Sequence, residues 1–315
     1  MNPIKNLFQS LDVDFSAKVR WRMRYDRNPL FITLQDKYKV REYAASKGVK
    51  TANLLYVTDR PETIPFGELP QKYLIKATHG CGWNIICFNS KFYLFGHGKE
   101  MVNQDGSLLN MDSATKYELS KAEVIKKCEE WLALKYTRRE WAYHQIIPKI
   151  IVEELLVSKD NKALRDYKLY TFQGVVKAIA VRSAIYRKNG ENVIFDPDWK
   201  EIKLTTYRDR RPDVIPEKPA MLGEMIDIAQ KLGEEVDFAR IDLYNTTQGV
   251  ILGEITLYPE AGMRASPTSC RVFNKWLGDQ WKLGRIDIVN AFYWNIASKV
   301  RAYGVSIVRK HLRGI

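Results

Sequence analysis

The sequence predicts an α+β protein, and three observations support this prediction. Residues 166–182 indicate a β-hairpin about the turn Gln173-Gly174, and residues 239–258 indicate a second hairpin whose strands place alternate side chains on opposite faces. Residues 73–88 indicate two short strands around a loop that contains glycines. Helical segments with recognisable end signals occupy residues 36–48 and 120–136. Helices and paired strands in one chain define an α+β fold.

The predicted helices begin and end at residues with ordinary capping chemistry. Asp36 suits the N-cap of the first helix, and Gly48 closes it. Ser120 with Glu123 forms a capping-box pattern at the start of the second helix. A third helix is predicted after Pro219. The remaining segments are a basic, aromatic N-terminal stretch, a connecting strand with prolines, a polar excursion and a Pro- and Arg-rich loop: residues 1–35, 49–70, 99–118 and 196–219.

The composition is that of a folded protein with anionic partners. The 315 residues are 45% hydrophobic and 28% charged, enough for two modest domains. No stretch approaches the roughly 20 apolar residues of a membrane span, and the N-terminus lacks the features of a secretory signal. We therefore expect a cytoplasmic protein. The net charge of +13 favours anionic partners without choosing among nucleotides, acidic glycans, phospholipid and nucleic acid.

The cysteines and histidines do not form a metal or redox motif. The four cysteines include no CxxC pair, and the four histidines form no HExxH pattern. Any bound metal should therefore have oxygen ligands.

The hairpin at residues 239–258 carries the most informative polar side chains. Strand alternation places Arg240, Asp242 and Tyr244 on one face of the first strand. With Tyr244 opposite Val250, an assumed register, Glu254 joins that surface. Two carboxylates beside an arginine suit a magnesium–phosphate site. A solvated strand face with an Arg–Glu cross-strand pair is the alternative, and spacing alone favours it.

Two further segments suit nucleotide binding. Lys76 ends a strand before a glycine-bearing loop, whose backbone N–H groups could cradle phosphates, although the loop matches neither a Walker A motif nor GxGxxG. Residues 150–157 form an apolar strand that includes Glu153 and Glu154, and could connect two lobes, its backbone contacting adenine and one acid the ribose. A simple β-turn and a strand with two exposed glutamates are the alternatives.

The order of these motifs resembles the ATP-grasp superfamily, and more narrowly its TupA-like branch, which is linked to bacterial teichuronopeptide and other surface-polysaccharide biosynthesis. The resemblance covers roughly residues 20–280. The matching segments are DRNPL (26–30), DKYKVREY (36–43), YLIKATHGCGWNII (73–86), REW…IIPKIIVEELL (139–156), DYKLYTFQG (166–174), FARIDLYN (238–245) and GEITLYPEAGM (253–263).

The resemblance implies two α+β lobes that hold ATP between them, with a C-terminal helical extension. The implied divisions are an N-terminal region (1–70), a small lobe (71–150), a large lobe with the metal-binding hairpin (151–274) and basic amphipathic C-terminal helices (275–315).

The resemblance also implies a role for individual residues. Lys37 and Lys76 would contact the ATP phosphates, and the loop with His79, Gly80, Gly82 and Asn84 would close over them. The adenine and ribose hinge would be formed by Glu153, Glu154, Leu155 and Leu156, and Lys168 would lie in the cleft near the nucleotide. Mg²⁺ would be held by Asp242 and Glu254, with Thr256 where the superfamily often has an asparagine ligand. Arg182 and Arg240 would face the transferred phosphate or the acceptor carboxylate. Gly262 would end the strand near the acceptor pocket.

The implied activity is that of a Mg²⁺- and ATP-dependent carboxylate–amine ligase, which forms an amide through an acylphosphate in capsule, exopolysaccharide or teichuronopeptide biosynthesis. Its partners would be ATP, a carboxylate-bearing acceptor such as a uronic acid or amino acid, and an amine. The alternatives are an ATP-grasp kinase acting on a glycan precursor and a non-catalytic basic protein that binds membrane or nucleic acid. Because no nucleic-acid motif is present, we expect no nucleic-acid partner.

The C-terminal segment, residues 275–315, is aromatic, apolar and basic. It could lie on anionic lipid at the inner face of the membrane, or dock on a membrane-bound glycan-assembly protein. A helix that covers the core and exposes a basic face is the alternative.

Overall fold

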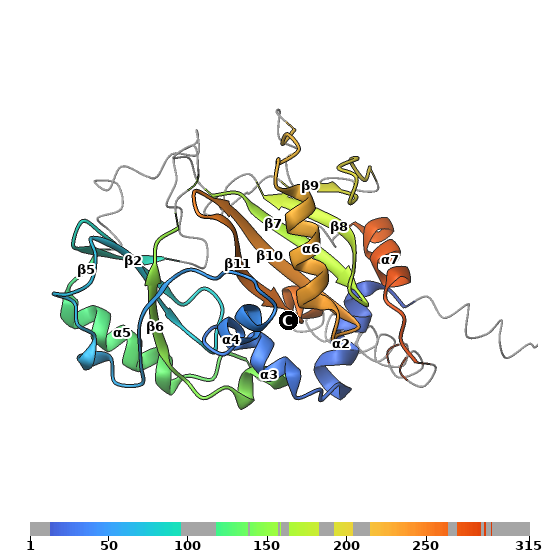
Figure 1. The fold of residues 1–315 in the computed structure, drawn as a ribbon. Coiled ribbons are helices and arrows are strands. Elements are labelled where there is room, and N and C mark those ends of the chain that lie inside the picture. The colour runs from blue at the N-terminus through green and yellow to red at the C-terminus, as the bar shows by residue number, and fades with distance from the viewer. Residues whose placement is uncertain are drawn as a thin grey trace, which may run out of the picture. The chain divides into compact units, whose positions relative to one another are not determined.

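Figure 1 shows the fold of the chain, a computed structural model, as a ribbon. The structure describes residues 13–95, 118–137, 139–156, 158, 164–182, 192–203, 215–263, 270–284, 287 and 291. Contacts divide the chain into a helical unit, Met1–Arg27, Leu204–Thr206 and Tyr258–Ile315, and a two-sheet unit, Asn28–Lys203 and Tyr207–Leu257. The lobe boundaries expected at residues 70, 150 and 274 stay predictions.

The first sheet of the two-sheet unit is antiparallel and has six strands. In spatial order they are β1 (Leu54–Thr58), β6 (Ile150–Glu154), β2 (Lys72–Ala77), β3 (Asn84–Phe88), β4 (Lys91–Phe95) and β5 (Glu118–Leu119). The predicted strand–loop–strand unit is β2 and β3, and the predicted connector is β6. Because β6 lies between β1 and β2, a segment far along the chain completes this sheet.

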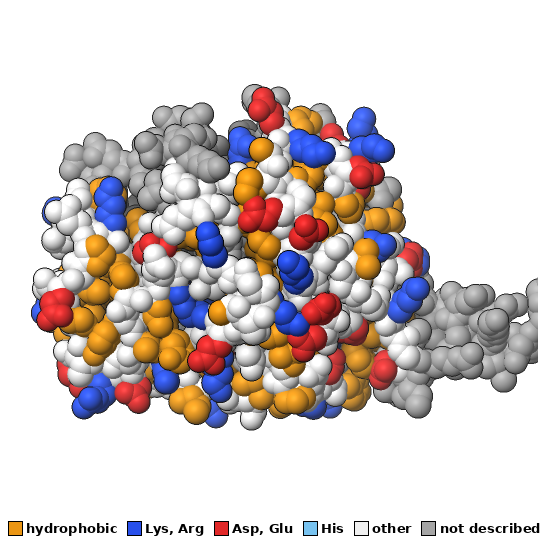
Figure 2. Space-filling view, viewed as in Figure 1, with side chains coloured by type: hydrophobic (Ala, Val, Ile, Leu, Met, Phe, Trp, Pro, Cys, Tyr) orange, Lys and Arg blue, Asp and Glu red, His pale blue; other side chains and the backbone are white. Residues whose placement is uncertain are grey.

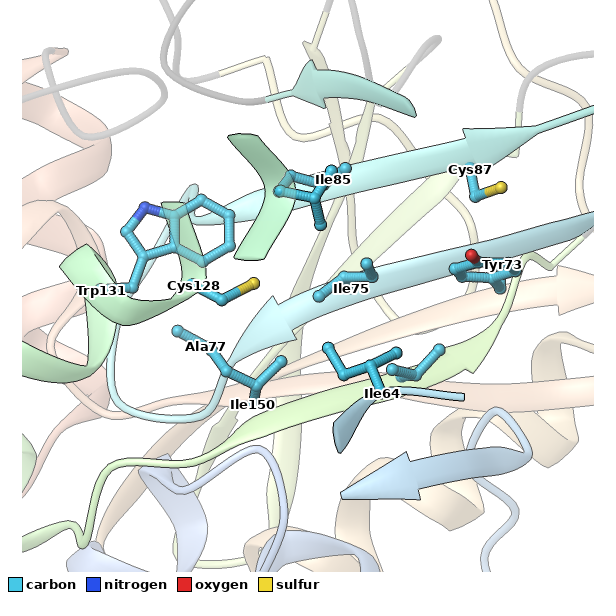
Figure 3. Close-up of a cluster of buried hydrophobic side chains, with 11 residues drawn as sticks. Ile64, Tyr73, Ile75, Ala77, Ile85, Cys87, Cys128, Trp131 and Ile150 are labelled. Atoms are coloured by element: carbon cyan, nitrogen blue, oxygen red, sulfur yellow. The ribbon is translucent and has the colours of Figure 1, made fainter. Parts of the chain in front are cut away.

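Helix α5 (Lys121–Ala133) covers one face of the first sheet. Its Val124, Cys128 and Trp131 pack with strand residues such as Ile75 and Ile85 in one buried cluster (Figure 3). The predicted capping box at its start is confirmed. The Ser120 hydroxyl accepts from the backbone N–H of Glu123, and the Glu123 carboxylate accepts from the backbone N–H of Ser120. The helix is shorter than predicted, since it ends at Ala133.

The second sheet is also antiparallel and has five strands in the order β11-β10-β7-β8-β9. Their bounds are β7 (Asp166–Phe172), β8 (Val175–Arg182), β9 (Asn192–Phe195), β10 (Phe238–Thr246) and β11 (Gly249–Thr256). Both predicted hairpins are confirmed as β7–β8 and β10–β11. Helix α6 (Leu222–Gly233) lies along this sheet and buries Met225, Ala229 and Leu232 (Figure 1).

Several short helical elements complete the two-sheet unit. They are α3 (Leu30–Gln35), α4 (Val40–Ser46) and the 3-10 turns η1 (Pro61–Thr63) and η3 (Trp141–Gln145). Gln35 fixes α3 to β11, since its amide nitrogen donates to the Ile255 carbonyl at 2.6 Å. The helix predicted from Asp36 begins only at Val40. The Asp36 carboxylate instead accepts from the Tyr38 amide at 2.9 Å and so caps a preceding turn.

The helical unit contains α2 (Phe15–Tyr25), the 3-10 turn η4 (Pro259–Gly262) and α7 (Arg271–Gln280). The ammonium of buried Lys18 donates to the Gly278 carbonyl at 2.7 Å, and the guanidinium of buried Arg22 lies 4.3 Å from the Trp281 ring. Lys18 therefore supplies a donor at the carboxyl end of α7, where the helix dipole favours positive charge, while Arg22 packs against the ring that follows the helix. Most of the predicted basic segment 275–315 lies outside the described residues.

Charge on the visible face is mixed. Figure 2 shows basic and acidic side chains interspersed there, so the net charge of +13 is not gathered into one patch on that face. In the described part of the chain, no helix has the length and apolarity to cross a membrane.

Candidate functional site

The β10–β11 hairpin places the two predicted metal ligands at directly opposite positions on neighbouring strands. In the antiparallel register Asp242 lies opposite Glu254, and Arg240 lies opposite Thr256. The assumed register was wrong, because Tyr244 pairs with Ile251 and not with Val250.

A bulge accounts for the difference in register. The pairing shifts between Asp242 and Leu243, which leaves Gly253 as an extra residue on β11. A Cβ atom at Gly253 would lie 2.5 Å from the Tyr244 ring, so only glycine fits there without displacing that ring. The bulge brings Glu254 beside Asp242, which the assumed register did not.

The Asp242 carboxylate is held by two cations. Arg240 donates to it through Nε and Nη2, both at 2.7 Å, and Lys168 on the neighbouring strand β7 donates at 2.7 Å. The Lys168 ammonium also lies 2.5 Å from Asp166. Arg240 further donates to the Thr256 hydroxyl at 3.1 Å. Strands β7, β10 and β11 thus contribute side chains to one buried ionic network.

The two aspartates of this network differ in their protonation. Burial alone would raise the pKa of Asp242, but Arg240 and Lys168 together hold it below its usual value. Burial raises the pKa of Asp166, and Lys168 offsets this only in part. Asp242 is consequently the more firmly ionised carboxylate of the pair.

Lys37 connects the predicted phosphate loop to the metal hairpin. Its ammonium donates to the Gly80 carbonyl at 2.6 Å and lies 3.6 Å from Glu254. Glu140, just before η3, is buried, and burial together with Glu254 raises its pKa to about 7. Glu140 was not identified from the sequence.

The glycine loop between β2 and β3 is fixed from behind by α5. His79 is buried, and its Nε2 lies 3.0 Å from the Trp131 carbonyl and 3.2 Å from that of Leu134. Burial lowers the pKa of His79, which favours a neutral imidazole whose Nε2 carries the proton and donates. The side chain is thus committed to α5, and a phosphate contact by His79 would have to use its backbone.

Close packing against Trp83 explains one loop glycine. A Cβ atom at Gly80 would lie 2.5 Å from the Trp83 ring, which is stacked on Trp131. Gly82 has a φ of 71°, a conformation that favours glycine. Asn84 begins β3 opposite Lys76.

An open pocket lies between the two sheets, with lining residues from strands of both. Predicted nucleotide residues that line it are Lys37, Lys76, Glu153, Glu154, Leu155 and Leu156. Lining residues that sequence reasoning missed include Val40, Arg41, Leu74, Leu164, Tyr244 and Leu252. A backbone hydrogen bond of 2.9 Å from Leu252 to the Lys50 carbonyl connects the segment before β1 to β11.

Charged groups in the pocket are paired. Glu153 accepts from Lys76 and, at 3.2 Å, from Arg41. Glu154 accepts from the backbone and side-chain nitrogens of Asn53 at 3.1 and 3.0 Å, which fixes it to the segment before β1. Arg41 follows Lys37 by four residues, which is one turn of the helix predicted from Asp36, and this spacing was the available sequence signal for it.

The remaining predicted residues lie elsewhere. Lys168, Arg240, Asp242 and Thr256 belong to the ionic network and are not among the pocket-lining residues. Arg182 ends β8 opposite Asp166, but its side chain lies outside the described part of the structure. Gly262 lies in the helical unit, where its carbonyl accepts from Arg20.

The α+β architecture, with two antiparallel sheets and a pocket between them, is that of an ATP-grasp protein. The chain belongs to the TupA-like ATPgrasp family, whose model matches residues 17–282. The predicted superfamily, branch and fold class are thereby confirmed, and the membership agrees with the predicted ATP-dependent enzyme class and with ATP and Mg²⁺ as cofactors.

Three solved structures illustrate what the chain is similar to, each at low sequence identity. One is D-alanine–D-alanine ligase from Bacillus anthracis complexed with ATP, at 13% identity and a TM-score of 0.42, covering 79% of this chain and 63% of that one. Another is the ATP-grasp ligase PsnB with a precursor variant, Mg and ADP, at 12% identity and a TM-score of 0.38, covering 84% and 61%. N5-carboxyaminoimidazole synthetase from Staphylococcus aureus matches at 10% identity and a TM-score of 0.41, covering 80% and 52%.

The chain thus spans less than two thirds of the length of each of these structures. A comparison with curated proteins finds no match.

Proposed function

We propose that this protein is a Mg²⁺- and ATP-dependent ligase that joins a carboxylate to an amine. The observation that carries the proposal is the direct pairing of Asp242 with Glu254 beside a cleft lined by Lys37 and Lys76, in a chain of the TupA-like ATPgrasp family. An isolated acidic pair would be a common surface feature. Paired acids beside a cationic cleft between two sheets suit a metal–nucleotide complex.

The nucleotide would occupy the pocket between the sheets. The backbone of residues 154–156 offers hydrogen-bonding groups beside the apolar side chains of Leu74 and Leu252, a combination that suits adenine. Lys76 and Lys37 supply positive charge for the phosphates. In the described structure Lys76 is paired with Glu153, so phosphate binding would require Lys76 to exchange this partner.

The residues of the hairpin fit Mg²⁺. The ion takes oxygen ligands, commonly one or two protein carboxylates with the substrate phosphates and water. Asp242 and Glu254 provide such carboxylates, and the described residues hold no larger cluster of His, Cys, Asp or Glu suited to a metal. Thr256 accepts from Arg240 and therefore supports that arginine more directly than a metal. When bound, Mg²⁺ would neutralise phosphate charge.

The protein's own groups would act by position and charge. Lys37, Lys168 and Arg240 surround the paired carboxylates and would stabilise negative charge as the γ-phosphoryl group moves to an acceptor carboxylate. Attack of an amine on the acylphosphate would then form the amide and release phosphate.

We further propose that the acceptor belongs to surface-glycan assembly, in capsule, exopolysaccharide or teichuronopeptide biosynthesis. Support comes from the family resemblance and from the basic composition, which suits a uronic acid or another acidic acceptor. Peripheral contact with the inner membrane through residues 275–315 stays a prediction, because that segment lies mostly outside the described residues.

The test is release of ADP in a screen of uronates and amino acids against amines. A ligase releases ADP and phosphate only when both acceptors are present. A phosphorylated product that forms without an amine and survives hydroxylamine would instead identify a kinase, because hydroxylamine cleaves acylphosphates. Failure to bind ATP in calorimetry with Mg²⁺ would leave a non-catalytic role.

Variants of the paired acids test the metal assignment. Asp242→Asn and Glu254→Gln should each abolish Mg²⁺-dependent ATP binding and ADP release. Matched controls are Asp227→Asn and Glu224→Gln, which make the same chemical changes on the exposed face of α6. Near-normal turnover in either paired-acid variant would overturn the assignment.

A further inference from the structure

Lys168 bridges two carboxylates from neighbouring strands. Its ammonium lies 2.5 Å from Asp166 and 2.7 Å from Asp242. The side chains are largely buried, with exposures of 16% for Lys168, 8% for Asp166 and 4% for Asp242. A buried ammonium is costly without an anionic partner, so at least one of these pairings must persist in any state that keeps Lys168 charged and enclosed.

The hydrogen bonds of the two aspartates are distributed unequally. Asp242 accepts two bonds from Arg240 and one from Lys168. Asp166 is paired with Lys168 through Oδ2, while its Oδ1 is buried and has no hydrogen-bond partner among the described residues. An unfilled buried acceptor costs free energy. Movement of the three-donor ammonium toward Asp166 would fill it.

Mg²⁺ binding at Asp242 would require such a movement. A metal ion on Oδ2 of Asp242 would compete for that oxygen with Lys168, and with Nη2 of Arg240, and it would repel the Lys168 ammonium at short range. Asp166 lies two residues from Lys168 on β7 and offers an unused oxygen. Lys168 could therefore leave Asp242 and still keep Asp166 as a counter-ion.

We propose that Asp166 is a positioning residue that retains Lys168 in the site when Asp242 takes up Mg²⁺. This inference rests on the proposed function, since it assumes that Asp242 binds the metal. Asp166 would not touch nucleotide or metal. It would lower the cost of freeing Asp242 and keep the lysine beside the reacting groups.

The first measurement uses calorimetry to determine the dissociation constant of Mg²⁺ for the full chain in the presence of saturating ADP. Asp166→Asn should raise the dissociation constant for Mg²⁺ about tenfold, the size expected when one charge-assisted hydrogen bond is lost. Asp166→Glu keeps the carboxylate and should stay within about threefold of the native protein, the smaller change expected when the charged partner is retained. Asp227→Asn is the control for the same chemical change at an exposed position.

The second measurement reports on Lys168 itself. Labelling of its amine by an acylating reagent, quantified by mass spectrometry, should stay low in the native protein with and without Mg²⁺. In Asp166→Asn it should rise several-fold only when Mg²⁺ and ADP are present, because the displaced ammonium then lacks a buried partner. A residue that merely stabilised the fold would not make this labelling depend on Mg²⁺.

The outcomes separate this inference from the proposed function. An unchanged Mg²⁺ dissociation constant in Asp166→Asn overturns the inference. Weakened Mg²⁺ binding with unchanged Lys168 labelling also overturns it, because Asp166 would then act by its charge alone. If Asp242→Asn binds Mg²⁺ normally, the proposed metal site itself is wrong. If Asp166→Asn does not fold, near-native Mg²⁺ binding and Lys168 labelling in Asp166→Glu support the inference, and weakened Mg²⁺ binding in a folded Asp166→Glu overturns it.

Discussion

Glu140 should make the stability of this protein fall as the pH rises from weakly acidic to neutral. The side chain is 7% exposed, and burial, followed by the nearby charge of Glu254, raises its pKa from 4.5 to about 7. In the unfolded chain the same group has its ordinary pKa. Between these two values the native protein holds a proton that the unfolded chain has already released. Stability therefore falls with increasing pH across this window.

The size of the effect follows from the difference between the two pKa values. Each unit of pKa corresponds to about 1.4 kcal/mol, so a rise from 4.5 to about 7 corresponds to roughly 3 kcal/mol. This contribution is fully present below pH 4.5 and is lost by about pH 7. Glu140→Gln removes the titration, and the variant should gain stability relative to the native protein by about that amount over the same range.

Urea denaturation followed by tryptophan fluorescence, at several pH values from 4.5 to 8 with a chelator present, measures this difference directly. The titration of His79 is common to both proteins and cancels in the comparison. Glu129→Gln, at an exposed position on α5, is the matched control and should show no such trend. Glu254→Gln should move the window to lower pH, because it removes a neighbouring negative charge from Glu140.

A stability difference between Glu140→Gln and the native protein that is the same at every pH would refute this reasoning. It would mean that the carboxyl group does not change protonation between the folded and unfolded states in this range.

Three further variants test local packing and capping. Gly80→Ala places a methyl group 2.5 Å from the Trp83 ring, and we expect a loss of about 1–3 kcal/mol in urea denaturation together with weaker ATP binding in calorimetry. Ser120→Ala removes the capping hydroxyl of α5 and should cost about 1 kcal/mol in the same denaturation assay, whereas Ser120→Asp should keep most of the stability. Gly278→Ala places a methyl group 2.8 Å from the Phe15 amide nitrogen; because backbone cannot move aside as a side chain does, thermal unfolding should show a clear loss of stability, and an unchanged midpoint would contradict the packing of α2 on α7.

Local sequence signals predicted most of the elements that carry the site. The Gln173-Gly174 turn located the hairpin β7–β8, two-residue alternation supported the hairpin β10–β11, and the Ser120 pattern located the start of α5. These signals depend on residues close together in the chain. The start of α4 was misplaced, because the Asp36 carboxylate caps the turn before the helix and the sequence does not distinguish these two uses of an aspartate.

The relation between strands was harder to predict. The bulge at Gly253 changes the hairpin register, and it depends on the position of the Tyr244 ring. The contact between Lys168 and Asp242 depends on β7 lying beside β10, although β8, β9 and α6 come between these two strands in the chain. Arg41 had an available signal in its spacing from Lys37, which was not used.

The sequence alone was enough to predict the family and the kinds of element, and it supplied the candidate site residues: lysines proposed for phosphates, an apolar segment proposed as a hinge and two acids proposed for a metal. The tertiary structure decided how these groups are paired. It placed Glu254 opposite Asp242 through the bulge, gave Lys168 two acidic partners, committed His79 to α5 and buried Glu140 near Glu254. The physical reason is that alternation and capping act over a few residues, whereas ionic partners and desolvation depend on which distant strands and helices pack together.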